Sequence, residues 1–216
     1  MRGFFNYHNG IFRAINKFAD CIFVSILWVI FSIPIITMGA STTALYYTVR
    51  KVIRYERSNI WKEFWESFRL NFKQSTIVWC GLLVFYLVAI FCVYTAYLNS
   101  ESIGAFSAIL IFLLLTSFAT TWAIYVFAYI ARFVMATGDI LKNCTLIELA
   151  NLFWSVLIGF AFLISFMICF FVPITFIVVP AYFMLICDLI LSKVFRKYMS
   201  QEDLEQELLW IETEDL

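Results

Sequence analysis

One acidic residue stands in a long apolar segment near the end of the chain. Asp188 lies within FMLICDLILSKVF, and Lys193 follows five residues later. An ionisable side chain in an apolar helix is costly in lipid, so it is a candidate for binding a substrate, carrying a proton or pairing with a cation. Arg132, at the end of another apolar segment, is the candidate partner. We favour a structural ion pair, with a role in transport as the alternative.

A stretch rich in hydroxyl and small residues follows the first apolar segment. Residues 32–53 read SIPIITMGASTTALYYTVRKVI. Small side chains let helices approach closely and hydroxyls bond between helices, which suits close packing or a polar path. The small residues are Gly39, Ala40, Ser41, Thr43 and Ala44, and Thr42 is a further candidate. Pro34 and Thr37 belong to an expected turn over residues 32–37, since Pro34 cannot continue a regular helix without a kink. Packing against the first helix is favoured. A path would need its polar side chains to meet in one cavity, namely Thr42, Thr43, Tyr46, Tyr47, Arg132 and Asp188.

Residue types that serve catalysis are scarce. His8 is the single histidine, so one chain cannot assemble a His-based metal site, and the six cysteines are scattered without CxxC spacing. No nucleophile–base pair, paired carboxylates or Gly-rich phosphate loop is recognisable. We therefore expect no enzyme activity and no cofactor.

The composition is typical of an integral membrane protein. The 216 residues are 63% apolar and 14% charged, against about 45–50% and about 25% in soluble domains. At about 20 residues per spanning helix, five or six spans fit. We predict an all-α, polytopic helical bundle: one transmembrane domain over residues 1–198 and an acidic cytoplasmic tail over residues 199–216.

The positions of the cations predict the topology. All fifteen Lys and Arg residues lie in four segments, residues 1–18, 50–73, 131–148 and 193–198. Short Lys- and Arg-rich segments stay in the cytoplasm. If residues 19–49 cross the membrane twice, all four segments share that side. This favours six helices in three hairpins, with five spans as the alternative. The returning helix would cover Met38 to Ile53, with Arg50 and Lys51 snorkelling to the inner surface.

Amphipathic segments precede several spans. Residues 61–75, WKEFWESFRLNFKQS, repeat aromatic rings every three or four positions, with charges on the other face. Such a helix lies along the membrane surface, and we predict an elbow leading into a span near Thr76. Residues 4–17 are expected to lie in the interface similarly, and residues 125–144 are a looser echo. Nucleic-acid binding is disfavoured because membrane helices flank the basic residues.

Three motifs carry a resemblance to a known family. They are PIITMGASTTALYY, with Pro34, Thr37, Gly39, Thr42, Thr43 and Ala44; FWESFRLNFKQS, with Phe64, Phe68, Asn71, Phe72, Lys73 and Gln74; and YVFAYIARF followed by LKN, with Tyr125, Phe127, Arg132, Phe133, Lys142 and Asn143. In their order and spacing the chain resembles the YesL-like family of bacterial membrane proteins. The molecular function of that family is unknown, and no catalytic residues are established for it. The resemblance also implies that the gene lies near genes for carbohydrate ABC transporters and glycan degradation.

Two functions follow as expectations. The first is a non-catalytic accessory subunit in the plasma membrane, with both termini cytoplasmic, that binds the permease and ATPase subunits of a carbohydrate ABC transporter. The second is a small-solute transporter or channel in its own right. Beside the bilayer, these subunits are the partners we expect.

Overall fold

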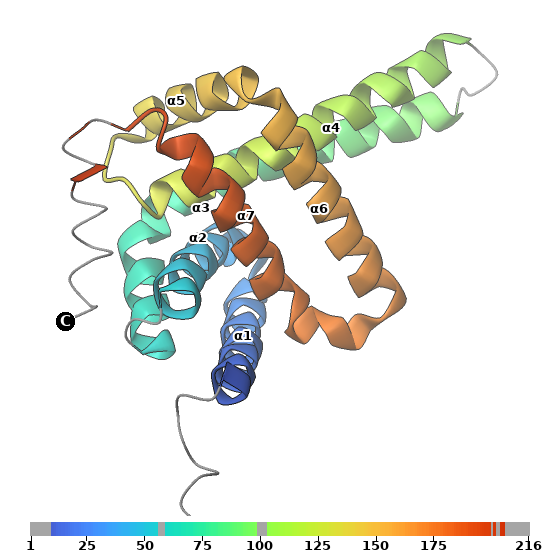
Figure 1. Cartoon of the computed structure of the whole chain (residues 1–216). Helices are drawn as coiled ribbons and strands as arrows, with labels where there is room; N and C mark the ends of the chain where they lie inside the picture. Colours follow the sequence, from blue (N-terminus) through green and yellow to red (C-terminus); the bar gives the residue numbers. More distant parts are fainter. Residues whose placement is uncertain (1–9, 56–58, 99–102, 200, 202–203, 206–216) are drawn as a thin grey trace, which may run out of the picture.

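The computed structural model describes residues 10–55, 59–98, 103–199, 201 and 204–205. Every regular element among these residues is a helix, as the all-α prediction required (Figure 1). The elements are α1 (Gly10–Ser32), η1 (Ile35–Thr37), α2 (Met38–Thr48), η2 (Val49–Arg54), α3 (Ile60–Leu98), α4 (Ile103–Ile130), α5 (Thr137–Ala150), α6 (Leu152–Phe171), η3 (Pro173–Ile177) and α7 (Val179–Phe195). Most of the predicted acidic tail lies outside the described residues.

Four of these helices are long and apolar enough to cross a membrane. They contain the segments Ile15–Ser32, Ile60–Leu98, Gly104–Ile130 and Leu152–Phe171. Four such helices indicate a multi-pass membrane protein. With 11 and 17 residues, α2 and α7 are shorter than the roughly 20 residues of a regular span. The total of six spans and their arrangement as three hairpins therefore stay predictions.

The turn after α1 is built by Pro34 and Thr37. Pro34 has no N–H to donate, so it suits the break between two helices. The Thr37 hydroxyl lies 2.6 Å from the Phe31 carbonyl oxygen and 2.8 Å from that of Pro34, at the end of α1. A new helix then begins at Met38, the predicted start of the returning helix, and the π-helix η2 continues it to Arg54.

Gly39 brings α2 against α3. A Cβ atom at this position would lie 2.6 Å from the Ser75 carbonyl oxygen and 2.6 Å from Trp79 Cβ. The neighbouring turn of α2 adds a buried hydrogen bond between the hydroxyls of Thr43 and Ser75, at 2.9 Å. Packing against α1 is also present, since the Ser41 hydroxyl donates to the Trp28 carbonyl at 3.0 Å. The expectation that α1 is the main neighbour is thus incomplete, because the closest approach is to α3.

The predicted elbow over residues 61–75 is helical but is not a separate element. It forms the first part of α3, a single helix of 39 residues. Its rings also do more than face the membrane surface: Phe64 and Phe68 are buried, with ring centroids 5.5 Å and 5.1 Å from Phe31 of α1. Trp61 and Trp65 stack on each other and stay more exposed. Part of the predicted interfacial segment 4–17 belongs to α1, because residues 10–17 form the beginning of this helix. The rest of the segment lies outside the described residues.

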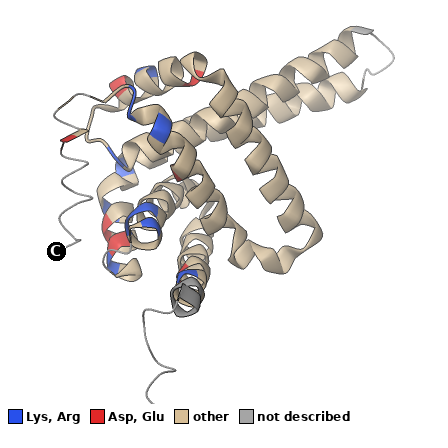
Figure 2. Cartoon of the chain, in the orientation of Figure 1, with Lys and Arg blue, Asp and Glu red and all other residues tan. Residues whose placement is uncertain are grey.

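Two parts of the molecule differ in charge. The far ends of α3 and α4 form a hairpin that projects away from the other helices (Figure 1). Figure 2 shows this hairpin and α6 without charge along most of their length, whereas Lys, Arg, Asp and Glu gather near η2, the start of α3, α5 and the end of α7. The helix α5 belongs to the charged part and connects α4 to α6.

Candidate functional site

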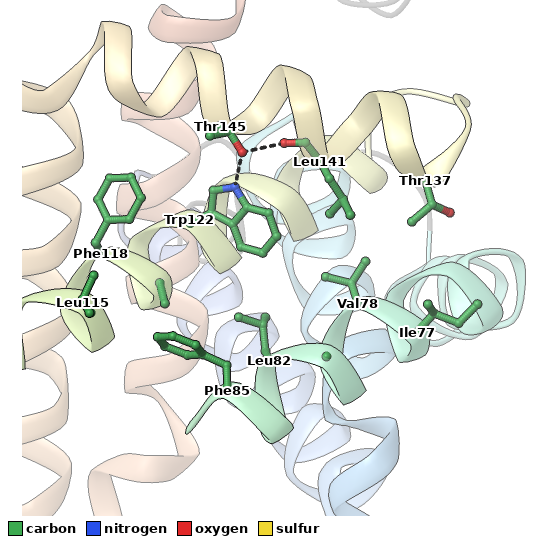
Figure 3. Close-up of a pocket in the computed structure, with 12 residues that line it drawn as sticks. Ile77, Val78, Leu82, Phe85, Leu115, Phe118, Trp122, Thr137, Leu141 and Thr145 are labelled. Atoms are coloured by element: carbon green, nitrogen blue, oxygen red, sulfur yellow. Dashed lines mark hydrogen bonds between the residues drawn. The ribbon is translucent and has the colours of Figure 1, made fainter. Parts of the chain in front are cut away.

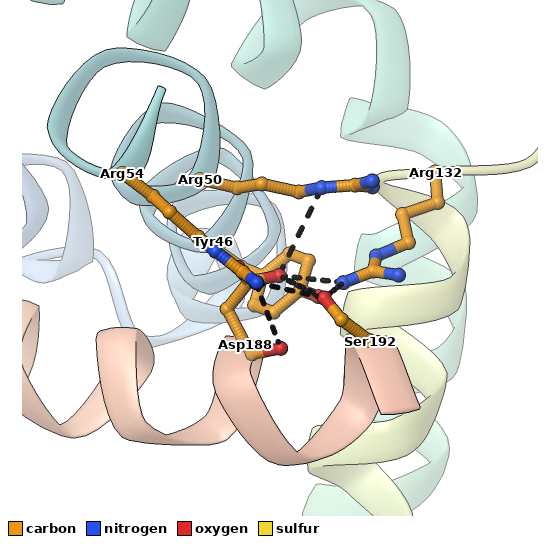
Figure 4. A network of polar contacts seen from close by, with 6 residues as sticks. All are labelled: Tyr46, Arg50, Arg54, Arg132, Asp188 and Ser192. Atoms are coloured by element: carbon orange, nitrogen blue, oxygen red, sulfur yellow. Dashed lines mark hydrogen bonds and ion pairs between the residues drawn. The ribbon is translucent and has the colours of Figure 1, made fainter. Parts of the chain in front are cut away.

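Asp188 is the centre of a buried polar network (Figure 4). Its carboxylate is fully buried in α7 and accepts hydrogen bonds from the Tyr46 hydroxyl at 2.7 Å and from Arg132 Nη2 at 2.5 Å. Arg54 Nη1 donates to Oδ2, and Arg50 Nε lies 3.9 Å from Oδ1. The network thus joins α2, η2 and the turn that follows α4 to α7.

Ser192 completes the network one turn further along α7. Its hydroxyl oxygen accepts from Arg132 Nη2 at 2.7 Å and from Arg54 Nη1 at 2.9 Å, and lies 3.3 Å from Asp188 Oδ1. Arg132 is itself enclosed, with its side chain 2% exposed. Its guanidinium lies 5.5 Å from the Tyr46 ring centroid and 5.1 Å from that of Phe195. Both rings add cation–π stabilisation to the buried cation.

This arrangement holds charge in place rather than moving it. A carboxylate has about four lone-pair positions, and Asp188 receives Tyr46, Arg132, Arg54 and Ser192. Charge-assisted bonds to buried cations strongly favour the ionised form. Asp188 therefore joins three parts of the chain that are distant in sequence, namely residues 46–54, Arg132 and its own helix α7. The predicted pairing of Asp188 with Arg132 is confirmed.

The other predicted site residues lie elsewhere. The hydroxyl of Thr42 accepts a hydrogen bond from Trp28 Nε1 at 3.2 Å, and Pro34, Thr37, Gly39 and Thr43 serve the turn and the α2–α3 contact described above. Asn71 donates to the Ser67 carbonyl of its own helix at 3.0 Å. Phe72 packs on Phe68, and Lys73 is exposed. Phe64 and Phe68 belong to the cluster around Phe31, so none of these residues reaches Asp188.

Sequence reasoning missed part of the network. Arg50 was expected to snorkel to the surface, but it turns towards Asp188, and Arg54 was not singled out. Tyr46, Arg50 and Arg54 are spaced four residues apart, a regular spacing that places them along one face of a helix. Lys51 also turns inward, donating to Glu63 Oε2 at 2.7 Å. The spacing of Tyr46, Arg50 and Arg54 was the sequence signal for this part of the network.

A second buried acid, Glu148 of α5, was also missed. It is fully buried, and its Oε1 lies 2.5 Å from the Thr121 hydroxyl of α4. Its Oε2 has no hydrogen-bond partner among the described residues. Burial raises the pKa of the Glu148 carboxyl to about 7. The sequence signal was an acid directly before the apolar segment of α6.

An apolar cavity of about 430 Å³ lies between α1, α2, α3, α4, α6 and α7. Trp28, Thr42, Tyr86, Phe166 and Phe183 are among the residues of its wall. Of the six side chains proposed for a polar path, Thr42 lines this cavity, whereas Tyr46, Arg132 and Asp188 belong to the buried network. These side chains do not meet in one cavity of the part of the chain that the structure describes.

Comparison with known proteins is informative for one part of the chain. Residues 21–94 match the model of a family described as a protein of unknown function, DUF624. The match covers the second half of α1, then α2, η2 and nearly all of α3, including the Gly39 contact and the Phe64–Phe68 cluster. Arg132 and Asp188 lie beyond it. No curated protein and no solved structure is detectably similar to this chain. The matched region is therefore similar to a domain of unknown function.

Proposed function

We propose that this chain is a non-catalytic, multi-pass protein of the plasma membrane that acts as an accessory subunit of a larger membrane complex. The observation that carries the proposal is the projecting α3–α4 hairpin. Its outer part has no charged side chain among the described residues, and its apolar residues are widely exposed: Leu87 66%, Phe91 66% and Leu114 72%. An exposed apolar hairpin is a suitable surface for the spanning helices of a partner.

The fate of the buried charges supports the same function. Asp188 and its arginines bond to one another and to neighbouring helices. This arrangement does not favour a relay for ions or protons. The residues of the cavity are mainly aromatic and aliphatic, which is poorly suited to a sugar that needs hydrogen bonds as well as stacking. A small-solute transporter is the second candidate, and both observations weigh against it.

The nature of the partner comes from the resemblance rather than from the geometry. The three motifs resemble the YesL-like family, whose genes accompany carbohydrate ABC transporters. We therefore take the permease and ATPase of such a transporter as the partner. Both termini are placed in the cytoplasm in this proposal, because that orientation puts all the cationic segments on the inner side.

A pull-down tests the proposal. The tagged protein is purified in a mild detergent and its companions are identified by mass spectrometry. We expect recovery of a carbohydrate permease with its ATPase. The paired variant Leu87→Ala/Phe91→Ala should lose both companions.

The matched control is Leu163→Ala/Phe160→Ala on α6, where the two side chains are similarly exposed, at 52% and 60%. It removes the same side chains from another lipid-facing helix and should keep the companions. A protein that copurifies with no membrane partner, or equal loss in both variants, would rule out docking through the hairpin.

A further inference from the structure

Beyond the accessory role, we infer that the cavity between α1, α2, α3, α4, α6 and α7 is a binding site for the acyl chain of a membrane phospholipid. The cavity measures about 430 Å³. Close-packed protein interiors contain few voids larger than a water molecule. An apolar cavity of about 150 Å³ already takes up a benzene molecule, so this volume suits a much longer apolar group.

The cavity wall is ordered rather than loosely packed. The rings of Trp28 and Phe176 lie 5.7 Å apart, and those of Phe162 and Phe183 lie 5.8 Å apart in an edge-to-face arrangement. These contacts join α1 to η3 and α6 to α7. A wall fixed by contacts between different elements stays open without an occupant.

The main polar groups of the wall already have partners within the protein. Trp28 Nε1 donates to the Thr42 hydroxyl at 3.2 Å, and Trp79 Nε1 donates to the Ile35 carbonyl at 2.7 Å. The hydroxyls of Tyr86 and Thr120 bond to each other at 3.1 Å. A polar ligand would lose its hydrogen bonds to water and gain few in return. The chemistry of the wall therefore selects an apolar occupant.

The occupant can enter from the bilayer. Among the residues that the structure describes, none of those lining the cavity is charged. Two of its wall residues, Phe166 and Phe176, are 54% and 44% exposed. Since Phe166 belongs to α6, one of the four candidate spans, the exposed side of the cavity meets lipid. Phospholipid acyl chains are the apolar groups present there in excess, which is why we commit to an acyl chain rather than to a free small hydrophobe.

Lipid retention tests the inference. The full chain is stripped with detergent, incubated with dioleoyl phosphatidylglycerol, washed, and examined by native mass spectrometry and thermal unfolding. We expect one lipid to be retained and Tm to rise on its addition. Filling the cavity with Ala123→Leu should lower retention roughly tenfold and abolish the rise in Tm. Ser165→Leu fills the cavity from α6 and provides the same test if Ala123→Leu does not fold.

The control uses a second apolar groove, between α3, α4 and α5 (Figure 3). A Cβ atom at Gly81, which lines this groove, would meet nothing within 4 Å. Gly81→Leu therefore adds an apolar side chain at an open position outside the cavity and should retain lipid like the unmodified protein. The inference is overturned if the unmodified protein retains no lipid, if Gly81→Leu loses lipid as strongly as the filling variants, or if only a small hydrophobe such as decane raises Tm.

Discussion

Two buried acids of this chain lie in very different surroundings. Asp188 of α7 and Glu148 of α5 are both fully buried. Asp188 is surrounded by three arginines, a tyrosine and a serine, whereas Glu148 has the hydroxyl of Thr121 beside one oxygen and no partner at the other among the described residues. Burial alone does not decide how an acid behaves. The number and charge of its partners decide whether it is fixed or free to titrate.

The hydrogen count around Glu148 supports this contrast. The Thr121 hydroxyl lies 2.5 Å from Glu148 Oε1 and 2.9 Å from the Phe118 carbonyl oxygen, but it has a single hydrogen to donate. The Thr121 hydroxyl can donate this hydrogen to Oε1 of the ionised acid, which favours the ionised form and opposes the effect of burial. A single hydrogen is nevertheless far less than the several donors that surround Asp188.

Removing the carboxylate of Asp188 should have the largest effect. Asp188→Ala leaves the buried Arg132 guanidinium without its counter-charge, which costs about 3–5 kcal/mol for a buried pair. We expect that loss in the free energy of unfolding, measured by denaturant titration in micelles. Asp139→Ala, an exposed acid at the start of α5, is the control and should change the value by about 0.5 kcal/mol or less. Equal effects of the two substitutions would show that the network does not stabilise the fold.

The pH dependence of stability should depend on Glu148. Its pKa is raised by burial from 4.5 to about 7, so the folded state binds the proton more tightly than the unfolded state. The stabilisation is complete below about pH 4.5 and is lost as the pH rises through 7, with a slope of up to about 1.4 kcal/mol per pH unit. Thermal unfolding between pH 5 and 8 should show a falling Tm. In Glu148→Gln the decline should be much flatter, and a decline of unchanged size would assign it to other groups.

Tyr46→Phe should have an intermediate effect. It removes a hydrogen bond to a buried carboxylate, worth about 1.5–3 kcal/mol, and we expect the lower end because Arg132, Arg54 and Ser192 remain. The ring stays, so its contact with Arg132 is kept. Unfolding titrations compare this variant with Tyr182→Phe, an exposed tyrosine of α7. A cost as large as that of Asp188→Ala would mean that Tyr46 carries the network.

Thr121→Val should have the smallest effect on stability but a specific one on titration. The Thr121 hydrogen bond lowers the pKa of Glu148 in opposition to burial. Without it, the midpoint of the pH-dependent decline in Tm should move upward by about one pH unit. Thr116→Val, whose hydroxyl bonds to carbonyls of α4, is the control. A downward or absent shift would contradict the assignment of the decline to Glu148.

The sequence predicted the elements better than their contacts. Apolar run length and Pro34 placed α1, the turn and the start of α2 correctly, because these features depend on neighbouring residues. The pairing of Asp188 with Arg132 was also predicted, since a charge in an apolar segment needs a partner. Arg54 and Asp188 are 134 positions apart, and no local pattern shows that they meet.

Other features depended on packing that no periodicity records. The aromatic spacing of residues 61–75 fits a surface helix, but it fits equally well a helix that buries Phe64 and Phe68 against Phe31. Glu148 falls at the border of an apolar segment, where an acid usually reaches water. From this position in the sequence, nothing indicates that the Glu148 side chain is buried where α5 packs against Thr121 of α4.

The unbroken hydrogen-bond ladder of α3 has a mechanical consequence. A helix of 39 residues is about 58 Å long, far more than the hydrocarbon thickness of about 30 Å. When a bilayer thins, a helix that is too long tilts. Since α3 has no joint between Ile60 and Leu98, a tilt of its lipid-embedded part also swings Trp61 and Trp65 at its other end. We therefore expect a change in bilayer thickness to shift these two indole rings, together with their contact to Phe31 of α1.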